Sequence, residues 1–313
     1  MKTSSTFAGA VAGYVRRRLQ AGSGRKPLAF RVLATAAVIV RRSGLGGFVD
    51  RGRHAVDALC FRLGMLPLRL RVDGLVFRGF LRDRSFLESV AAGYEPFTHE
   101  LLLNALKPGV TFVDGGAHIG LYTILAAREK PEARIWAFEP DPLNFRALTA
   151  NVTRNGVMNT TIIPRALSAR GSRAILYRNR GGRGNSLVAR TDVGPTQPIE
   201  VTTTSLDDEL AGEPLHRLVV KLDVEGAEPA ALQGMRGVLA RAQDAMVILE
   251  VNPGALRDAG TSPEALVEVI QGVGLHPLAI NEAGHRLEPL TPALLARKGN
   301  LLCRRAANLR SSR

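Results

Sequence analysis

Along most of the chain beyond residue 110, short apolar runs alternate with longer amphipathic stretches. The short runs predict strands at residues 111–114, 134–139, 160–164, 217–223, 244–250, 276–280 and 300–304. The stretches between them, with apolar residues at helical spacing, predict helices at residues 119–130, 142–155, 228–241 and 262–273. This alternation is typical of a mostly parallel sheet with helices on both faces, which places the chain in the α/β class.

Two shorter patterns precede this alternation. Residues 70–78 carry an Asp73-Gly74 pair between alternating runs, which predicts a β-hairpin. Residues 100–106 predict a helix that is ended by the sequence Lys107-Pro-Gly109.

The alternation breaks between residues 168 and 206. Two short strands, 174–177 and 199–203, are predicted there around the sequence Arg180-Gly-Gly-Arg-Gly184. An insert rich in Gly and Arg is typical of a mobile loop over a pocket, and a plain surface hairpin is the alternative.

Composition and charge divide the chain. At 313 residues and 45% apolar content, it is long enough for one large core. Its two cysteines, Cys60 and Cys303, exclude a disulfide framework and a cysteine-based zinc site. The net charge of +14 is uneven, because residues 1–71 contain fourteen Lys and Arg but only two acids. We therefore predict a basic segment, helical or partly disordered, over 1–67, an enzyme-like domain over 68–306 and a disordered tail over 307–313.

The basic segment contains one apolar run, residues 27–40, which Arg31 interrupts. This run is too short to span a bilayer, which needs about 20 apolar residues. Two amphipathic helices flanking residues 43–47 would place the segment on an anionic membrane face, and a partly disordered leader is the alternative. Its aromatic residues occupy apolar helix positions and form no evident stacking platform, which disfavours nucleic acid as a partner. The expected location is cytoplasmic, with peripheral contact at the inner membrane face if the helices form.

The first chemical motif is Thr111-Phe-Val-Asp-Gly-Gly-Ala-His-Ile-Gly-Leu-Tyr-Thr123, where a strand ends in Asp114 and a turn of small residues leads into a helix. The next predicted strand ends in Glu139, which is placed to accept hydrogen bonds from both hydroxyls of a ribose. Ligands of α/β sheets bind at the carboxyl ends of strands. Gly115 and Gly116 allow a sharp turn and a close approach of the backbone to a ligand.

The same turn discriminates between two cofactors. A nicotinamide dinucleotide requires G-x-G-x-x-G, with no acid in the turn, so that its pyrophosphate can lie on the helix N-terminus. Here position 118 is His, and Asp114 would repel a pyrophosphate. A carboxylate instead suits the ammonium and sulfonium of S-adenosylmethionine, so we interpret the pocket as a methyl-donor site.

The second motif, Leu218-Val-Val-Lys-Leu-Asp-Val-Glu-Gly-Ala-Glu228, ends another predicted strand in the carboxylates of Asp223, Glu225 and Glu228. One of them could be a general base for a hydroxyl acceptor, or the cluster could hold a divalent metal that binds the acceptor oxygens. Glu228 alone also fits an acid that stabilises a helix N-terminus. If the cluster is not catalytic, His118 and Glu250 are the next candidates.

These motifs, with Ala137-Phe-Glu-Pro140, the series Asn144, Leu148, Asn151 and Asn155, Ala166-Leu167 and Ser205-Leu-Asp207, resemble the FkbM family of S-adenosylmethionine-dependent methyltransferases. The resemblance covers roughly residues 70–305 and implies a seven-stranded, Rossmann-like class I methyltransferase fold. It also implies O-methylation of a sugar or natural-product hydroxyl. The chain departs from the family at His118, where Asn is common, and this difference concerns the methionine end of the pocket.

Motifs and resemblance together define the expected site. S-adenosylmethionine would be held by Asp114, Gly115, Gly116, Ala117, His118, Gly120, Glu139 and Pro140, with Ala166 near the adenine and Asp223 at the methionine end. Asp223, Glu225 and Glu228 are the expected catalytic residues, and a divalent metal is left open. The expected activity is that of an O-methyltransferase acting on a hydroxyl of a sugar, glycolipid or natural-product acceptor. The alternatives are an RNA methyltransferase that uses the basic segment, and a non-catalytic membrane-associated binding protein with a methyltransferase fold.

Overall fold

The computed structural model describes residues 56–57, 59–72, 74–91, 93–179, 184–194 and 196–305. The chain forms two compact units, Met1–Arg62 and Leu63–Arg313, and all elements named below belong to the second. The amphipathic helices expected in the basic segment, and the tail at 307–313, lie outside the described residues and remain predictions. No helix in the described part of the chain is both long enough and apolar enough to cross a bilayer.

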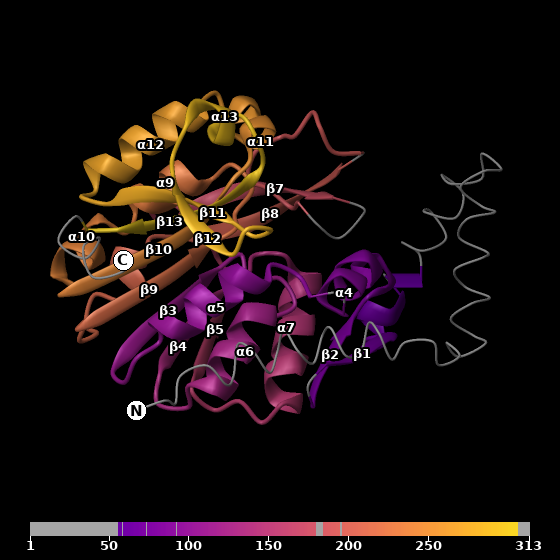
Figure 1. Ribbon diagram of the computed structural model, residues 1–313. Helices are drawn as coiled ribbons and strands as arrows, with labels where there is room; N and C mark the ends of the chain where they lie inside the picture. Colours follow the sequence, from indigo (N-terminus) through magenta and orange to yellow (C-terminus); the bar gives the residue numbers. More distant parts are fainter. Residues whose placement is uncertain are drawn as a thin grey trace. The chain divides into compact units, whose positions relative to one another are not determined.

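A central sheet confirms the predicted α/β class (Figure 1). Within the described residues its eight strands lie in the order β12 (Arg286–Pro289), β11 (His276–Asn281), β13 (Gly299–Arg304), β10 (Asp244–Val251), β9 (Arg217–Leu222), β3 (Val110–Gly115), β4 (Arg134–Phe138) and β5 (Thr160–Ile163). The strands from β10 to β5 are parallel, whereas β13 runs antiparallel to both β10 and β11. All seven predicted strands are present. The strand β12, which pairs with β11 at the edge, was not predicted.

Helices cover both faces of this sheet, and the two faces form separate parts of the core. On one face Phe112 and Val219 pack in an apolar cluster with α5 (Pro96–Ala105) and α6 (Leu121–Glu129). On the other face Val113 and Val220 pack with α9 (Glu228–Gln233), α10 (Arg236–Arg241) and α12 (Pro263–Gly272). Successive residues of a strand point to opposite faces, so each buried strand contributes to both clusters. Four shorter or peripheral helices complete the domain: α7 (Pro142–Arg154), α8 (Leu206–Glu209), α11 (Pro253–Asp258) and α13 (Pro292–Leu295).

Three predicted helices differ in the structure, and the one predicted over 100–106 begins earlier, at Pro96. The helix predicted over 228–241 is interrupted between α9 and α10 at Gly234, where an added Cβ would lie 2.0 Å from the carbonyl oxygen of Ser168. The backbone of Ser168 therefore packs directly against Gly234. The helix predicted from residue 119 begins only at Leu121, because His118 (φ 54°) and Gly120 (φ 93°) are left-handed.

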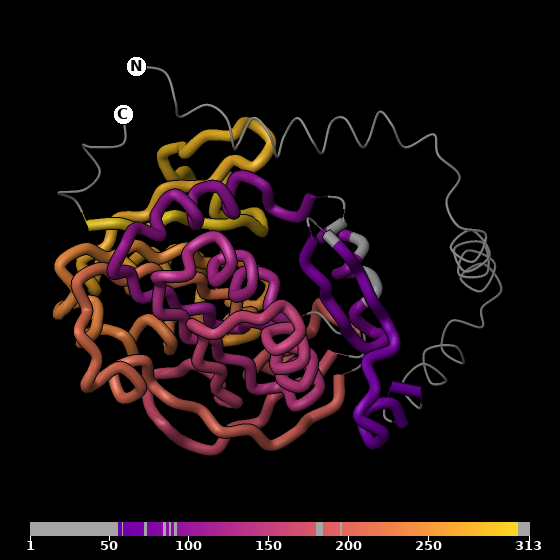
Figure 2. The backbone as a smooth tube through the Cα atoms, turned by 90° about the horizontal axis from the view of Figure 1, so that it is seen from below, coloured from indigo at the N-terminus to yellow at the C-terminus, as the bar shows by residue number. Residues whose placement is uncertain are grey.

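The predicted hairpin is present as β1 (Leu68–Val72) and β2 (Leu75–Gly79), followed by the short helix η1 (Leu81–Asp83) and α4 (Arg84–Ala91). It lies beside α7 (Figure 2). The side-chain amide of Asn151 bonds the N–H of Arg78 at 2.7 Å and its carbonyl at 2.9 Å, and Asn155 does the same for Val76 at 2.9 Å. Two amides one helical turn apart thus satisfy alternate residues of β2, as a neighbouring strand would.

The insert forms a separate small sheet with the order β6 (Ala166–Leu167), β8 (Thr196–Thr204) and β7 (Ser172–Asn179). Its strands β7 and β8 are antiparallel and extend beyond the predicted 174–177 and 199–203. Most of the Gly- and Arg-rich sequence between them, residues 180–183, lies outside the described residues, so its predicted mobility remains a prediction.

The role of Asn151 leads to a stability prediction. Asn151→Ala should lower the free energy of unfolding by roughly 1–3 kcal/mol, because it leaves buried backbone groups of Arg78 and Ile119 without their partner. Urea denaturation measures the change. Thr153→Ala, on the exposed side of the same helix, is the matched control and should change the free energy of unfolding by less than about 0.5 kcal/mol. Equal effects of the two substitutions would contradict this account of the hairpin.

Candidate active site

A cavity lies where β3, β4, β9 and β10 end at the carboxyl edge of the sheet. From β3 the chain continues to β4 on one side, whereas β9 lies on the other side and comes much later in the sequence. Such a topological switch point is where open α/β sheets bind ligands. Most of the predicted residues line this cavity, namely Asp114, Gly116, Ala117, His118, Glu139, Pro140, Ala166, Asp223 and Glu225.

The turn after β3 is shaped by close backbone contact. Gly116 is left-handed (φ 81°), and a Cβ there would lie 2.1 Å from the carbonyl oxygen of Asp223. The N–H of Asp223 also donates to the carbonyl of Gly115 at 3.0 Å. The N–H groups of Gly116 and Ala117 both donate to the carbonyl of Phe138. The turn therefore joins the ends of β3, β4 and β9, and it contributes space to the cavity without free backbone donors at these two residues.

Asp114 is buried at the end of β3 and lines the cavity. Its carboxylate accepts a hydrogen bond of 2.5 Å from the hydroxyl of Thr123 in α6. Burial raises the pKa of Asp114 to about 6, although Thr123 and the ammonium of Lys221 act in the opposite direction. A buried carboxyl in this state gains from a cationic ligand, which would restore its charge.

Glu139 follows β4 and is 4% exposed. Its carboxylate accepts hydrogen bonds from the N–H of His118 at 2.8 Å and from the N–H of Asp141 at 2.9 Å. Burial and the charge of Asp141 raise the pKa of Glu139 to about 7. The N–H groups of His118 and Asp141 thus hold the carboxylate of Glu139 at the cavity wall.

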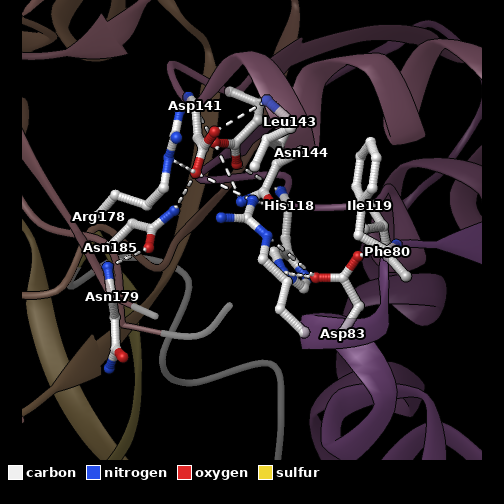
Figure 3. A network of polar contacts seen from close by, with 12 residues as sticks. Phe80, Asp83, His118, Ile119, Asp141, Leu143, Asn144, Arg178, Asn179 and Asn185 are labelled. Atoms are coloured by element: carbon white, nitrogen blue, oxygen red, sulfur yellow. Dashed lines mark hydrogen bonds and ion pairs between the residues drawn. The ribbon is translucent and has the colours of Figure 1, made fainter. Parts of the chain in front are cut away.

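A polar network around Asp141 adjoins the cavity (Figure 3). At its centre, Asp141 accepts hydrogen bonds from Arg82 Nη2 at 3.0 Å, Arg178 Nε at 3.0 Å and Asn185 Nδ2 at 2.7 Å. Burial opposes ionisation, yet Arg82 and Arg178 keep the pKa of Asp141 below its ordinary value. Asp141 therefore links the N-terminal hairpin region, Glu139 and the insert.

His118 belongs to the same network. Its Nε2 lies 3.6 Å from Asp83 Oδ1, and its ring packs edge-on against Phe86. Burial lowers the pKa of His118, but the hydrogen bond and charge of Asp83 outweigh that effect and raise it overall. These contacts fix the imidazole against the hairpin region while it still lines the cavity.

The acidic motif separates into three different environments. The side chain of Asp223 is 30% exposed in the cavity, and its ionic neighbour among the described residues is Lys221 Nζ at 3.8 Å. Glu225 has a left-handed backbone (φ 50°) and a carboxylate that accepts from Arg190 at 2.7 Å and Asn252 at 3.0 Å. Glu228 is buried and accepts a hydrogen bond from the N–H of Gly226 at 2.9 Å.

Two lysines compensate the carboxylates at this end. Lys221 is fully buried, lies 5.4 Å from the centre of the Tyr122 ring, and has its pKa raised by Asp223, Glu95 and Glu250 against the effect of burial. Lys298 Nζ lies 3.0 Å from Glu250 and 3.4 Å from Glu225. Burial and the nearby carboxylates of Asp223 and Glu225 nevertheless raise the pKa of Glu250 well above its ordinary value.

The possibility of a metal site can be tested against these contacts. Carboxylate oxygens of Asp223, Glu225 and Glu250 lie within 4.8 Å of one another, which is close enough for a common ion. However, Lys298 already bridges Glu225 and Glu250, and Arg190 bonds Glu225. Since ammonium and guanidinium groups occupy the acidic oxygens, the residues fit a charge-compensated cluster better than a metal centre.

Three predicted residues lie outside the cavity lining as far as the described residues show: Gly115, Gly120 and Glu228. Gly115 and Gly120 are packed instead, since a Cβ would meet Leu222 at 2.8 Å and Leu148 at 2.6 Å, respectively. Lining residues that sequence reasoning missed include Phe86, Tyr94, Tyr122, Asn144, Asn185, Leu187 and Lys298. Tyr122 and Asn144 lie in motifs quoted above but were not predicted as site residues. The others come from the hairpin region, the insert and the residue before β13, and no motif spacing connects them.

The comparisons with known proteins agree with this architecture. Residues 114–286 match the family model of the FkbM methyltransferase domain, so the chain belongs to the FkbM methyltransferase family. This confirms the resemblance found in the sequence, and with it the expectation of S-adenosylmethionine as the cofactor.

Among curated proteins, the 31-O-demethyl-FK506 methyltransferase FkbM of Streptomyces tacrolimicus is 30% identical over 158 residues, which cover 42% of this chain and 61% of that protein. Methyltransferase sdnD of Sordaria araneosa is 28% identical over 159 residues, covering 39% of this chain and 59% of that protein. The chain thus spans about three fifths of the length of these relatives.

Solved structures also show likeness. A precorrin-6y C5,15-methyltransferase from Geobacter metallireducens has 14% identity and a TM-score of 0.39 over 68% of this chain and 87% of its own. A SAM-dependent methyltransferase from Aquifex aeolicus has 10% identity and a TM-score of 0.40 over 72% of this chain and 98% of its own.

The raised pKa values of Asp114 and Glu139 predict pH-dependent cofactor binding. If Asp114 binds the cofactor's ammonium and Glu139 its ribose hydroxyls as ionised carboxylates, affinity for S-adenosylhomocysteine should fall by about twentyfold between pH 8 and pH 6. The stability of the protein without ligand should change with pH in the opposite direction. A raised carboxyl pKa stabilises the folded protein at low pH, and that contribution is lost as pH rises through 6 to 7. Calorimetry and thermal unfolding at both pH values measure the two trends.

Glu139→Gln is the control for this prediction. It should weaken binding by roughly 1–3 kcal/mol through loss of charged hydrogen bonds, and it should remove most of the pH dependence. Affinity that is the same at pH 6 and pH 8 in the unaltered protein, or stabilisation by NAD in place of S-adenosylhomocysteine, would contradict the assignment.

Proposed function

We propose that this protein is an O-methyltransferase that methylates a hydroxyl of a sugar, glycolipid or natural-product acceptor. The observation that carries the proposal is the carboxylate of Asp223. It is partly exposed in the cavity that Asp114 and Glu139 also line, and its ionic neighbour among the described residues is a single lysine, Lys221. A hydroxyl is a poor nucleophile, and a carboxylate in reach of the reacting oxygen can take its proton.

The two buried acids would hold the cofactor. Asp114 would accept from its ammonium, Glu139 would accept from both ribose hydroxyls, and Ala166 would contact the adenine. Bound S-adenosylmethionine supplies a methyl carbon that is already activated for displacement. The protein's remaining tasks are therefore to orient the acceptor hydroxyl and to remove its proton, and orientation alone contributes much of the rate enhancement.

The contacts favour Asp223 over the other two acids as the base. Both oxygens of Glu225 are engaged, by Arg190 and Asn252 on one and by Lys298 on the other. Glu228 is buried away from the cavity and caps the turn at Gly226. A base must reach the proton that it abstracts, and of the three side chains Asp223 is the most accessible, at 30% exposure.

The compensated charges favour a base over a metal at this cluster. A divalent ion between Glu225 and Glu250 would have to displace Lys298 and would lie close to Arg190. Two lysines instead compensate the acidic end, and the carboxylate of Asp223 remains partly exposed in the cavity.

The acceptor class is supported by family membership and by one relative's name. The Streptomyces tacrolimicus protein is named as a methyltransferase of 31-O-demethyl-FK506, which is consistent with a hydroxyl on a natural product. Neither the RNA methyltransferase alternative nor the non-catalytic binding protein gains support from the site, where four of the five expected acids, Asp114, Glu139, Asp223 and Glu225, line one cavity.

Substitutions of the three acids should separate their roles. Asp223→Asn should lower turnover by about 10²–10⁴-fold, as expected for a lost general base, with little change in S-adenosylhomocysteine affinity. Glu228→Gln should lower the melting temperature and leave turnover per folded molecule unchanged, because its contact is a local cap. Transfer of labelled methyl to a panel of methyl glycosides and hydroxylated macrolides measures turnover.

The same assay tests the metal alternative. EDTA should leave the turnover of the unaltered protein unchanged, and added Mg²⁺ should not increase it. Loss of activity in EDTA with recovery in Mg²⁺ would favour the metal. Unchanged turnover in Asp223→Asn would remove the proton-transfer role from this residue and direct attention to His118 and Glu250.

We also propose peripheral contact of the basic segment with anionic lipid. The proposal rests on the +12 charge of residues 1–71, because basic residues near an anionic surface contribute about 1 kcal/mol each. Full-length protein should float with phosphatidylserine vesicles and not with phosphatidylcholine vesicles. A full-length variant with Arg16, Arg17, Arg18, Arg41 and Arg42 changed to Gln should float less. Equal flotation of both proteins, or of neither, would favour the partly disordered leader.

A further inference from the structure

The segment over residues 184–192 connects the two chemically different ends of the cavity. Gly184, Asn185 and Leu187 line the cavity wall. At one end Asn185 donates to Asp141, which adjoins the ribose-side acid Glu139 (Figure 3). At the other end Arg190 bonds Glu225, two residues from the proposed base Asp223.

Glu225 is the main fixed point of this segment. Its side chain accepts from Arg190 Nη1 at 2.7 Å, and its backbone carbonyl accepts from the hydroxyl of Ser186 at 2.6 Å. The left-handed backbone of Glu225 (φ 50°) is uncommon for a residue with a side chain, and such strain persists only where surrounding contacts enforce it. One residue therefore binds the segment at two points.

The other contacts hold the segment's far end. The side chain of Arg190 is 3% exposed and also forms a two-pronged pair with Asp192, at 2.6 and 2.7 Å. The N–H and hydroxyl of Thr191 both donate to Asp258 in α11, at 2.7 and 2.8 Å. A guanidinium this well buried depends on both of its carboxylate partners, because removing one leaves a charge uncompensated.

We propose that Glu225 is a positioning residue that fixes residues 185–192 as the acceptor-side wall of the cavity, with Leu187 as the apolar contact for the acceptor. The inference rests on the proposed function, since it takes Asp223 as the base. It deepens that function by requiring an acceptor that presents an apolar face beside its reacting hydroxyl. Both oxygens of Glu225 already accept hydrogen bonds, so this residue would affect where the acceptor lies. A base would instead affect the removal of the acceptor's proton.

The test uses the full chain with Glu225→Gln, Arg190→Gln and the double variant. Both single variants should speed amide exchange over residues 186–192 by about tenfold, with unchanged exchange in β3 and β10, because the opening is local. The acceptor that the glycoside and macrolide panel identifies should show KM raised about tenfold and kcat within about threefold. The double variant should be no worse than either single one, since both remove the same contact.

Further variants keep the test specific. Leu187→Ala should raise the acceptor KM without faster exchange, and Arg190→Lys should give an intermediate result because it keeps the charge and loses the planar fork. Arg173→Gln is the matched control, since it removes an exposed ion pair with Glu200 on the neighbouring β7–β8 hairpin, and it should change nothing.

The outcomes distinguish this inference from the proposed function. Unchanged exchange over 186–192 in Glu225→Gln, or a loss of kcat as large as that of Asp223→Asn with KM unchanged, would overturn the positioning role. Faster amide exchange throughout β3 and β10 would show that Glu225→Gln unfolds generally. The amide exchange and acceptor KM of Arg190→Lys would then decide whether the positioning role holds. Failure of the unaltered protein to bind S-adenosylhomocysteine would defeat the proposed function while the exchange result still stands.

Discussion

The close approach of Gly116 to the carbonyl of Asp223 is the constraint on which the site depends. A Cβ at residue 116 would lie 2.1 Å from this carbonyl oxygen, so no side chain can be accommodated there. It holds the turn after β3 against the end of β9, so two segments more than 100 residues apart in sequence form one cavity edge. The buried acid of β3 and the accessible acid after β9 then face the same space, which is what a bound methyl donor and its acceptor require.

Charge is the second organising feature. The cavity wall carries five carboxylates, Asp114, Glu139, Asp223, Glu225 and Glu250, and burying charges is costly unless each finds a partner. Burial raises the pKa of Asp114, Glu139 and Glu250. In addition, Asp223, Glu225 and Glu250 have cationic partners among the described residues, namely Lys221, Arg190 and Lys298.

The insert connects these two halves. Arg178 and Asn185 of the insert donate hydrogen bonds to Asp141. Ser186 and Arg190 of the insert donate hydrogen bonds to Glu225. If the ligands bind as proposed, a wall anchored at both Asp141 and Glu225 would couple their positions, because displacement of one end strains the other. Loops on a rigid scaffold commonly carry specificity, and here the scaffold extends into the loop through buried ion pairs.

The sequence by itself determined the fold class, the seven strands predicted at their correct places, and the acids Asp114, Glu139 and Asp223, because each ends an apolar run at a recognisable spacing. It also determined the family, which the match over residues 114–286 confirmed. It did not determine that α9 and α10 are separate helices, since the close contact of Gly234 with the backbone of Ser168 is a tertiary one. Nor could it distinguish the three acids of one motif, which lie within six residues. The side chain of Asp223 is partly exposed in the cavity, Glu225 is paired with Arg190 and Lys298, and Glu228 caps a turn. The partners of Glu225, namely Arg190, Asn252 and Lys298, come from distant parts of the chain, and only tertiary packing decides which carboxylate is left accessible.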